Sequence, residues 1–284
     1  ILPRHLIDQA EAFAIEKDVF ARASRTFQKS LFQESGILPG EFSLRRMKIL
    51  DRRINGYPVP KFDGFPRGEI TLSILGMFLL EAPFLPVEQF AKNHTIGDIQ
   101  VVHIVEAIES FAKNRNQGGV YLNMEERETQ VIVQKEGYTL FLGEIPMGQS
   151  AFTEFFSDTL GMRATTAAAF QEQYSQGNLS QAVREKIQTY LLPEMKKFGT
   201  LAKEKLLNAK MVLPNAIWIF GKTRALRDAQ NLLGEEELQS LPFSQKPDTH
   251  FLLPKDIGEI KDFSALDDPA YTTLCLLGSA IHPQ

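Results

Sequence analysis

The sequence predicts a mixed α/β protein in which a small α+β subdomain is set into a larger α/β part. Three observations support this class. Residues 41–113 hold a self-contained pattern of strands and helices, which ends at the polar, glycine-rich stretch 114–119. Three short strands with tight turns follow that stretch. Further along, Ala216–Phe220 is apolar throughout, as expected of a strand buried on both faces of a parallel sheet. We therefore expect boundaries after residues 40 and 113.

The first expected helix covers residues 4–32. Large apolar side chains recur along it every seven residues, at Leu6, Phe13, Phe20 and Phe27. A stripe of this kind predicts a helix face that packs against the core, with a groove for a partner protein as the alternative.

The subdomain is expected to contain five elements. They are a strand at Arg46–Val59 with a turn at Asn55-Gly56, a long apolar strand at Glu69–Glu81, a helix from Pro86 to Asn93, a strand at Asp98–Ile104 and a helix at Val105–Lys113. Pro86 suits the first turn of a helix, where the missing amide hydrogen costs nothing.

The remaining chain alternates between strands and helices. Strands are expected at Val120–Asn123, Gln130–Lys135, Tyr138–Pro146, Ala216–Phe220 and Thr249–Leu252. Helices are expected at Ser150–Leu160, Thr165–Gln173, Ser180–Leu191, Glu194–Asn208, Ala225–Leu233 and Pro269–Gly278.

Composition excludes several classes of function. The net charge is −4, with Lys and Arg spread along the chain, which argues against a nucleic-acid surface. The single cysteine, Cys275, is expected to be a buried small residue, and the five histidines are scattered without metal-ligand spacing. No catalytic set and no metal site is predicted.

The sequence predicts a cytoplasmic protein with no direct membrane span. Its richest apolar run, Ile70–Leu80, is 11 residues long, whereas a spanning helix needs about 18 or more. The first 20 residues carry charge throughout and lack the apolar stretch of a signal peptide.

Residues 118–162 carry a resemblance to a known family. Thr129 follows a turn, Gly137 lies in the next turn, Ile145-Pro146-Met147-Gly148 ends the third strand, and Thr153 lies in the following helix. This order resembles the actin-like superfamily, and within it the bacterial FtsA and PilM type of scaffold protein. Two later segments, Ala216–Leu226 and Asp267–Gly278, resemble that family's last strand-and-glycine turn and its closing helix.

The resemblance implies an actin-like (ribonuclease H-like) two-lobed fold with an inserted small α+β subdomain. Residues 1–40 would then be a helix of the first lobe, whose start would precede residue 1. Residues 41–113 would be the inserted subdomain, and residues 114–284 the second lobe with its closing helix.

The resemblance also places a nucleotide site, and this chain departs from its pattern there. The matching positions are Asn123, Thr129, Gly148, Gly221 and Lys222. Asn123 stands in place of the family's aspartate, and the turn after it contains Glu125, Glu126 and Glu128 instead of glycines. Lys222 and Thr223 replace two further glycines. Carboxylates repel a polyphosphate, so we expect a degenerate site without ATP or magnesium; an anion held by Lys222 and Arg224 is an alternative.

Function follows from the resemblance as a hypothesis. The chain would be a non-enzymatic scaffold that binds other proteins at the cytoplasmic face of a bacterial inner membrane, in cell division or in pilus or secretion assembly. The partner would be a membrane protein's cytoplasmic peptide or a division or pilus component, with self-association also open. The alternatives are an ATP-binding actin-like ATPase or sugar-kinase-like enzyme truncated at its first phosphate loop, and an unrelated α+β binding protein.

Overall fold

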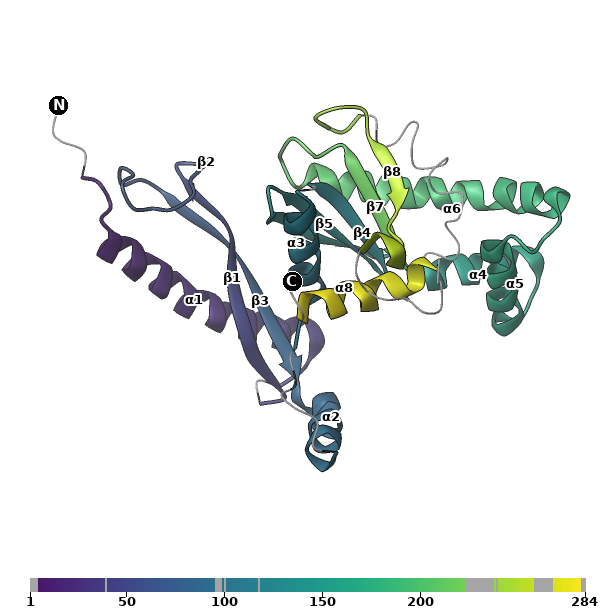
Figure 1. The fold of residues 1–284 in the computed structure, drawn as a ribbon, viewed down its shortest axis with the longest axis horizontal. Helices are drawn as coiled ribbons and strands as arrows, with labels where there is room; N and C mark the ends of the chain where they lie inside the picture. The colour runs from purple at the N-terminus through teal and green to yellow at the C-terminus, as the bar shows by residue number, and fades with distance from the viewer. Residues whose placement is uncertain are drawn as a thin grey trace. The chain divides into compact units, whose positions relative to one another are not determined.

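The computed structural model, drawn in Figure 1, describes residues 5–38, 40–94, 99, 101–116, 118–222, 238, 240–257 and 268–281. The chain divides into two compact units, Ile1–Val101 and Val102–Gln284. The division inferred from the sequence, at residues 1–40, 41–113 and 114–284, stays a prediction. The helix expected at Ala225–Leu233 lies outside the described residues.

The first unit consists of a long helix, a three-stranded sheet and a second helix. Helix α1 covers Gln9–Ser35, capped at its start by the Asp8 side chain and ended by Gly36 at φ 70°. The strands are β1 (Phe42–Ile54), β2 (Tyr57–Pro58) and β3 (Ile70–Leu80), in the antiparallel order β2-β1-β3. Helix α2 (Glu81–Asn93) follows β3 directly.

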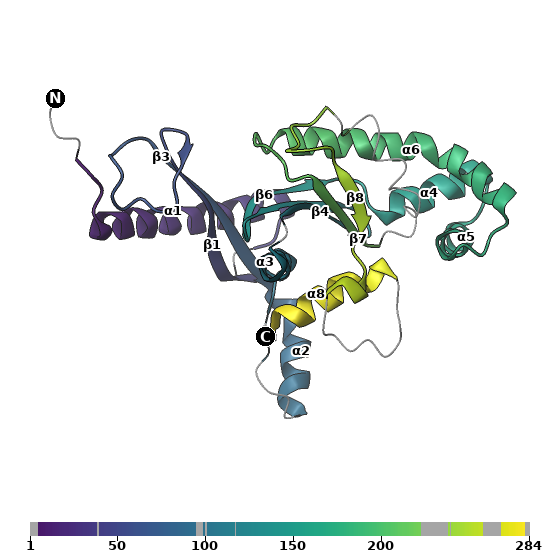
Figure 2. The ribbon, with the colours of Figure 1, turned by 45° about the horizontal axis from the view of Figure 1, so that its top comes forward.

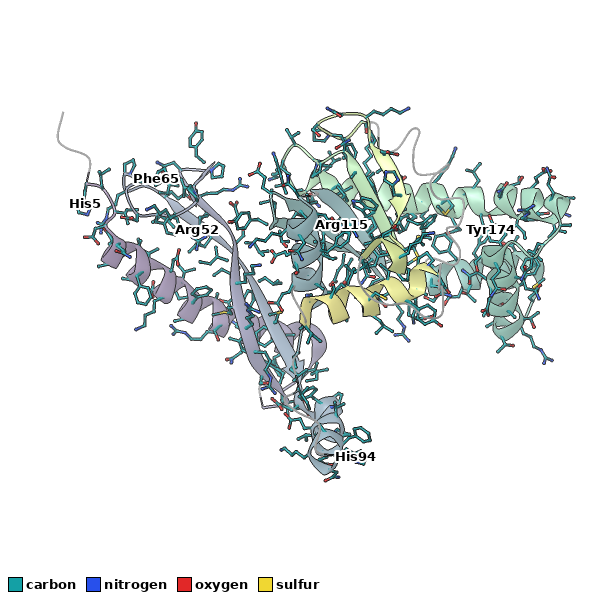
Figure 3. All side chains as sticks on the ribbon, in the orientation of Figure 1. His5, Arg52, Phe65, His94, Arg115 and Tyr174 are labelled. Atoms are coloured by element: carbon teal, nitrogen blue, oxygen red, sulfur yellow. The ribbon has the colours of Figure 1, made fainter. Side chains whose placement is uncertain are left out.

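Helix α1 packs on one face of this sheet. Phe27 lies against Gly76 and meets the ring of Phe78 edge-on, with ring centroids 6.1 Å apart. Arg52 of β1, labelled in Figure 3, forms a salt bridge of 2.8 Å with Glu16 of α1. The two long strands expected in this region are confirmed by β1 and β3 and their pairing.

The seven-residue stripe is only partly a packing face. Phe27 lies against the sheet, but Phe13 is 69% exposed and Leu6, before the helix, is 55% exposed. A straight α-helix turns by about 20° for each heptad. Phe13, two heptads before Phe27, is therefore rotated by about 40° away from the sheet, which explains its exposure; Leu6 lies outside the helix.

Two expectations for the subdomain were wrong. Helix α2 begins at Glu81 rather than at Pro86, which lies inside it. Pro83 falls among the first amides of the helix, which have no intrahelical acceptor, so only Pro86 costs a hydrogen bond. The strand expected at Asp98–Ile104 is absent from the described residues of that range, since Ile99 and Val101–His103 are irregular and Ile104 begins helix α3.

The second unit is built on a five-stranded sheet with the order β6-β5-β4-β7-β8. Strands β4, β7 and β8 are parallel to one another, and β5 is antiparallel to both β4 and β6. The strands are β4 (Gly119–Met124), β5 (Thr129–Lys135), β6 (Tyr138–Ile145), β7 (Ala216–Gly221) and β8 (Asp248–Phe251). All five strands expected here are confirmed.

Helices cover both faces of this sheet, as Figure 2 shows. On one face lie α4 (Gln149–Leu160) and α6 (Gln181–Leu207), with α5 (Ala164–Gln176) beside α4. On the other lie α3 (Ile104–Arg115) and α8 (Thr272–Ile281). Short 3₁₀ turns occur at Pro254–Ile257 and Pro269–Tyr271. This two-sided cover explains why every residue of β4 is buried.

Three local details differ from expectation. The helices expected at Ser180–Leu191 and Glu194–Asn208 are one helix, α6, with Pro193 inside it. Its buried face continues through the proline from Leu191 to Met195, and this packing outweighs the lost hydrogen bond. Helix α4 begins at Gln149, one residue before the expected Ser150, and has no side-chain cap. Cys275 is half-buried rather than buried.

Candidate functional site

The carboxyl ends of β4 and β7 lie side by side near the middle of the second unit's sheet. Asn123 pairs with Phe220 and Met124 with Gly221 in parallel register. From β4 the chain adds β5 and β6 on one side, and later β7 and β8 on the other. In open α/β sheets, ligands bind outside the strand ends at such a point of reversal. The structure brings all five positions predicted from the sequence to these strand ends.

The turn after β4 lies directly on the N-terminus of α4. It closes with a hydrogen bond of 2.8 Å from the Glu125 amide to the Glu128 carbonyl. The Gln149 amide donates to the Glu125 carbonyl at 3.0 Å, and the Ser150 amide to the Glu126 carbonyl at 2.8 Å. Free amides at a helix N-terminus attract anions. Here two of them are already bonded to the turn.

Gly148 and Gly221 allow close contact between segments of this chain. A Cβ at Gly148 would lie 2.5 Å from the carbonyl oxygen of Glu125 and 2.6 Å from the amide nitrogen of Glu128. Gly221 has φ 85°, and a Cβ there would lie 2.4 Å from the Met124 carbonyl oxygen. Both glycines are therefore required by the packing of the turn and the strand ends, whether or not a phosphate binds.

Asn123 is 1% exposed, and its side chain is bonded on both sides. The amide group donates to Glu125 Oε1 at 3.0 Å and to Gln130 Oε1 at 3.2 Å. Its Oδ1 accepts a hydrogen bond of 3.2 Å from the hydroxyl of Thr273, which belongs to α8. Both amide hydrogens are thus used within the protein, and the oxygen already has a donor.

Lys222 joins the end of β7 to the turn after β4. Its backbone amide donates to the Met124 carbonyl at 2.6 Å, and its ammonium group lies 2.8 Å from Glu126 Oε2. The charge that could attract a phosphate is therefore paired with a carboxylate of the same site. Thr223 and Arg224, named in the sequence expectations, lie outside the described residues.

The turn is electrostatically unfavourable for an anion. Burial raises the pKa of Glu128, and the neighbouring carboxylates of Glu144 and Glu125 raise it further. This direction shows that the carboxylates already repel one another. A polyphosphate would add more negative charge to the same place.

Thr129 forms a structural contact beside these strand ends. Its side chain is fully buried, and its hydroxyl donates to the Met147 carbonyl at 2.8 Å. It therefore ties the start of β5 to the segment that leads into α4.

Sequence reasoning missed Thr273, Gln130 and the pairing of Glu126 with Lys222. Thr273 and Lys222 lie 150 and 96 residues from their partners, so no local pattern could have joined them. Among the described residues, no cluster of metal-ligating side chains was found. None of the described helices is long and apolar enough to cross a membrane.

Comparison with known proteins identifies the fold. No family model and no curated protein matches the sequence. A solved PilM–PilN type IV pilus biogenesis complex contains a similar chain, with a TM-score of 0.61 and 14% identity over 93% of this chain and 74% of that one. The ethanolamine utilization protein EutJ of Carboxydothermus hydrogenoformans matches with a TM-score of 0.42 and 15% identity, over 62% of this chain and 53% of its own.

The first of these similarities shows that this chain has an actin-like fold, as the resemblance implied. It also excludes the alternative of an unrelated α+β fold. At 14% identity the similarity concerns the fold alone.

Proposed function

We propose that this protein is an actin-like scaffold of pilus assembly that binds a partner protein and does not turn over nucleotide. The fold similarity to the chain in the PilM–PilN complex supports the pilus pathway over cell division. One observation supports the proposal that the protein does not turn over nucleotide. Two amides at the N-terminus of α4 are bonded to the Glu125–Glu128 turn, and this turn carries carboxylates and a salt bridge where the resemblance would have a phosphate bound. A cytoplasmic protein of this kind would reach the inner membrane through its partner.

Titration with ATP and magnesium tests this proposal. We expect a dissociation constant weaker than about 1 mM, which corresponds to about −4 kcal/mol, because the site offers carboxylates and two amides of the α4 N-terminus are already bonded to the turn. Isothermal titration calorimetry is the measurement. The Lys222→Ala variant is the control, since residual binding that this variant loses would reveal an anion held by Lys222. A dissociation constant in the low micromolar range, about −8 kcal/mol, would favour the alternative of an ATPase or kinase-like enzyme.

The edge of β3 is the surface that fits an extended segment of a partner. β3 has one hydrogen-bonded neighbour, β1, and no strand on its other side among the described residues. Its 11 residues, ITLSILGMFLL, include no charged residue and no proline. Proteins normally protect such an edge with charge, proline or a cover. An added strand would satisfy its free backbone groups and bury its apolar side chains.

The helix beside this edge is also incompletely covered. Ile15, Val19, Phe20 and Phe27 of α1 are all half-buried, and no described side chain of this helix is fully buried. A 27-residue helix normally buries its apolar stripe completely. A strand added beside β3 would lie along this helix and complete its cover. We therefore assign the partner to an apolar, extended peptide.

Lysines placed on β3 should prevent strand addition. Thr71 and Ser73 are exposed, so Thr71→Lys with Ser73→Lys should leave the fold intact while charging the edge. We expect at least a tenfold lower recovery of membrane-protein partners from solubilised membranes of the source cells, measured by affinity capture and mass spectrometry. Gln28→Lys with Gln33→Lys, on exposed positions of α1, is the matched control. Equal recovery with both double variants would remove the β3 edge from the proposal.

A further inference from the structure

The orientation of α6 sets a row of lysines along one flank of the helix. Its inner side is buried on the sheet, through Ile187, Leu191, Met195, Phe198, Ala202 and Leu206. Lys196, Thr200, Lys203 and Leu207 are spaced by four, three and four residues, so they share one stripe along a flank of the helix, where Lys203 is half-buried and the other three are exposed. Lys210 follows three residues after the helix ends. We call Lys196, Lys203, Lys210, Leu207 and Val212 the α6 stripe.

The stripe is basic in an acidic chain. Residues 194–212 contain five lysines and two glutamates, a net charge of +3, whereas the whole chain has −4. Lys197 lies 3.6 Å from Glu194. Within the part of the chain that the structure describes, no carboxylate forms an ion pair with Lys196, Lys203 or Lys210.

Two large apolar side chains accompany these lysines. Leu207 is 48% exposed and Val212 is 59% exposed. Solvated lysine rows on helices do not need apolar residues among them, and a nucleic-acid surface would not favour them. A surface of anionic phospholipids binds both, because the phosphates attract the ammonium groups and the acyl boundary accepts the apolar side chains.

We propose that the α6 stripe is a contact site for an anionic phospholipid bilayer. This contact site is separate from the β3 edge proposed for the partner peptide and from the Glu125–Glu128 turn. From Lys196 to Leu207 the helical part of the stripe extends about 17 Å at 1.5 Å per residue, and Lys210 and Val212 follow shortly after the helix ends, so one membrane surface is large enough to contact all of them. Each lysine near an anionic surface contributes about a fivefold factor in partitioning, so three contribute about a hundredfold. The contact is therefore weak alone and strengthens attachment through a membrane-bound partner.

Vesicle co-sedimentation tests the site with the full chain. The probes are phosphatidylcholine vesicles and vesicles of phosphatidylcholine with phosphatidylglycerol. We expect binding to the anionic vesicles only, with a loss at high salt because counterions screen the charges. Lys196→Glu with Lys203→Glu and Lys210→Glu should lower binding at least tenfold. Leu207→Gln with Val212→Gln should lower it severalfold without changing its salt dependence.

A control with the same charge change separates the site from net charge. Lys17, Lys29 and Lys92 are exposed in the first unit, and their triple change to Glu should retain binding. Circular dichroism checks that each variant is folded. The proposal is overturned if the wild type ignores anionic vesicles, if it binds both vesicles equally, or if both triple variants lose binding alike. Binding to soluble polyglutamate but not to vesicles would also overturn it, in favour of an acidic protein partner.

Discussion

Replacing Gly148 by alanine is expected to lower the free energy of unfolding by about 3 kcal/mol. The new Cβ would lie 2.5–2.7 Å from backbone atoms of Glu125, Arg127 and Glu128, and backbone cannot move aside as the end of a flexible side chain can. The turn would have to leave the N-terminus of α4, which would free the amides of Gln149 and Ser150. Urea unfolding followed by the fluorescence of Trp218, the single tryptophan and part of the same sheet, measures this change.

Gly278→Ala is the control for this experiment. Gly278 lies in α8, and a Cβ there would meet no atom within 4 Å. Because alanine favours a helix over glycine by about 1 kcal/mol, this variant should be as stable as the wild type or more so. If Gly148→Ala unfolds at the same urea concentration as the wild type, the turn does not pack on α4. The proposal that the Glu125–Glu128 turn blocks the nucleotide site would then be wrong.

Replacing Asn123 by aspartate is expected to cost about 2–4 kcal/mol at neutral pH. The exchanged group is the amide that donates to Glu125 and Gln130. An aspartate oxygen there would face two acceptors in a place that is 1% exposed. Both burial and the Glu125 carboxylate would raise the pKa of this aspartate in the folded protein above its ordinary value of about 3.9.

The sign of the pH dependence follows from that raised pKa. Below the ordinary value the aspartate is protonated in both the folded and the unfolded protein, so the loss of stability is small. Between the ordinary pKa and the raised folded-state pKa, the unfolded chain has released the proton while the folded protein keeps it. The loss of stability therefore grows with pH in this window and reaches its full size above the folded-state pKa. Urea unfolding of the variant and of the wild type between pH 4 and pH 7 measures this difference.

Asn178→Asp, at an exposed position, is the matched control and should show no such pH dependence. The family's ATP-binding members, to which the resemblance points, have aspartate at the position of Asn123. An Asn123→Asp variant that keeps wild-type stability and gains binding of ATP with magnesium would contradict the proposal that this protein does not bind nucleotide.

Local chemistry explains which elements could be predicted. The turns at Asn55-Gly56 and Glu136-Gly137 adopt positive φ at both residues, as two-residue hairpin turns require. With the β-branched apolar run Val131–Val133 in β5, such signals placed most strands to within a few residues. The extent of α6 through Pro193 depends on packing instead, and no pattern inside that segment records the packing. At Val101–His103 the strand prediction missed a local signal, since His103 and Glu106 form the capping box that begins α3.

By itself, the sequence determined the charges of the Glu125–Glu128 turn, the replacement of an aspartate by Asn123 and the apolar character of β3. It could not determine what these residues contact. The tertiary structure decided that Thr273 bonds to Asn123 across 150 residues and Lys222 to Glu126 across 96. It also decided that β3 lies at an edge. Residue type is a local property, whereas partners distant in the chain meet only when the sheet and its helices assemble.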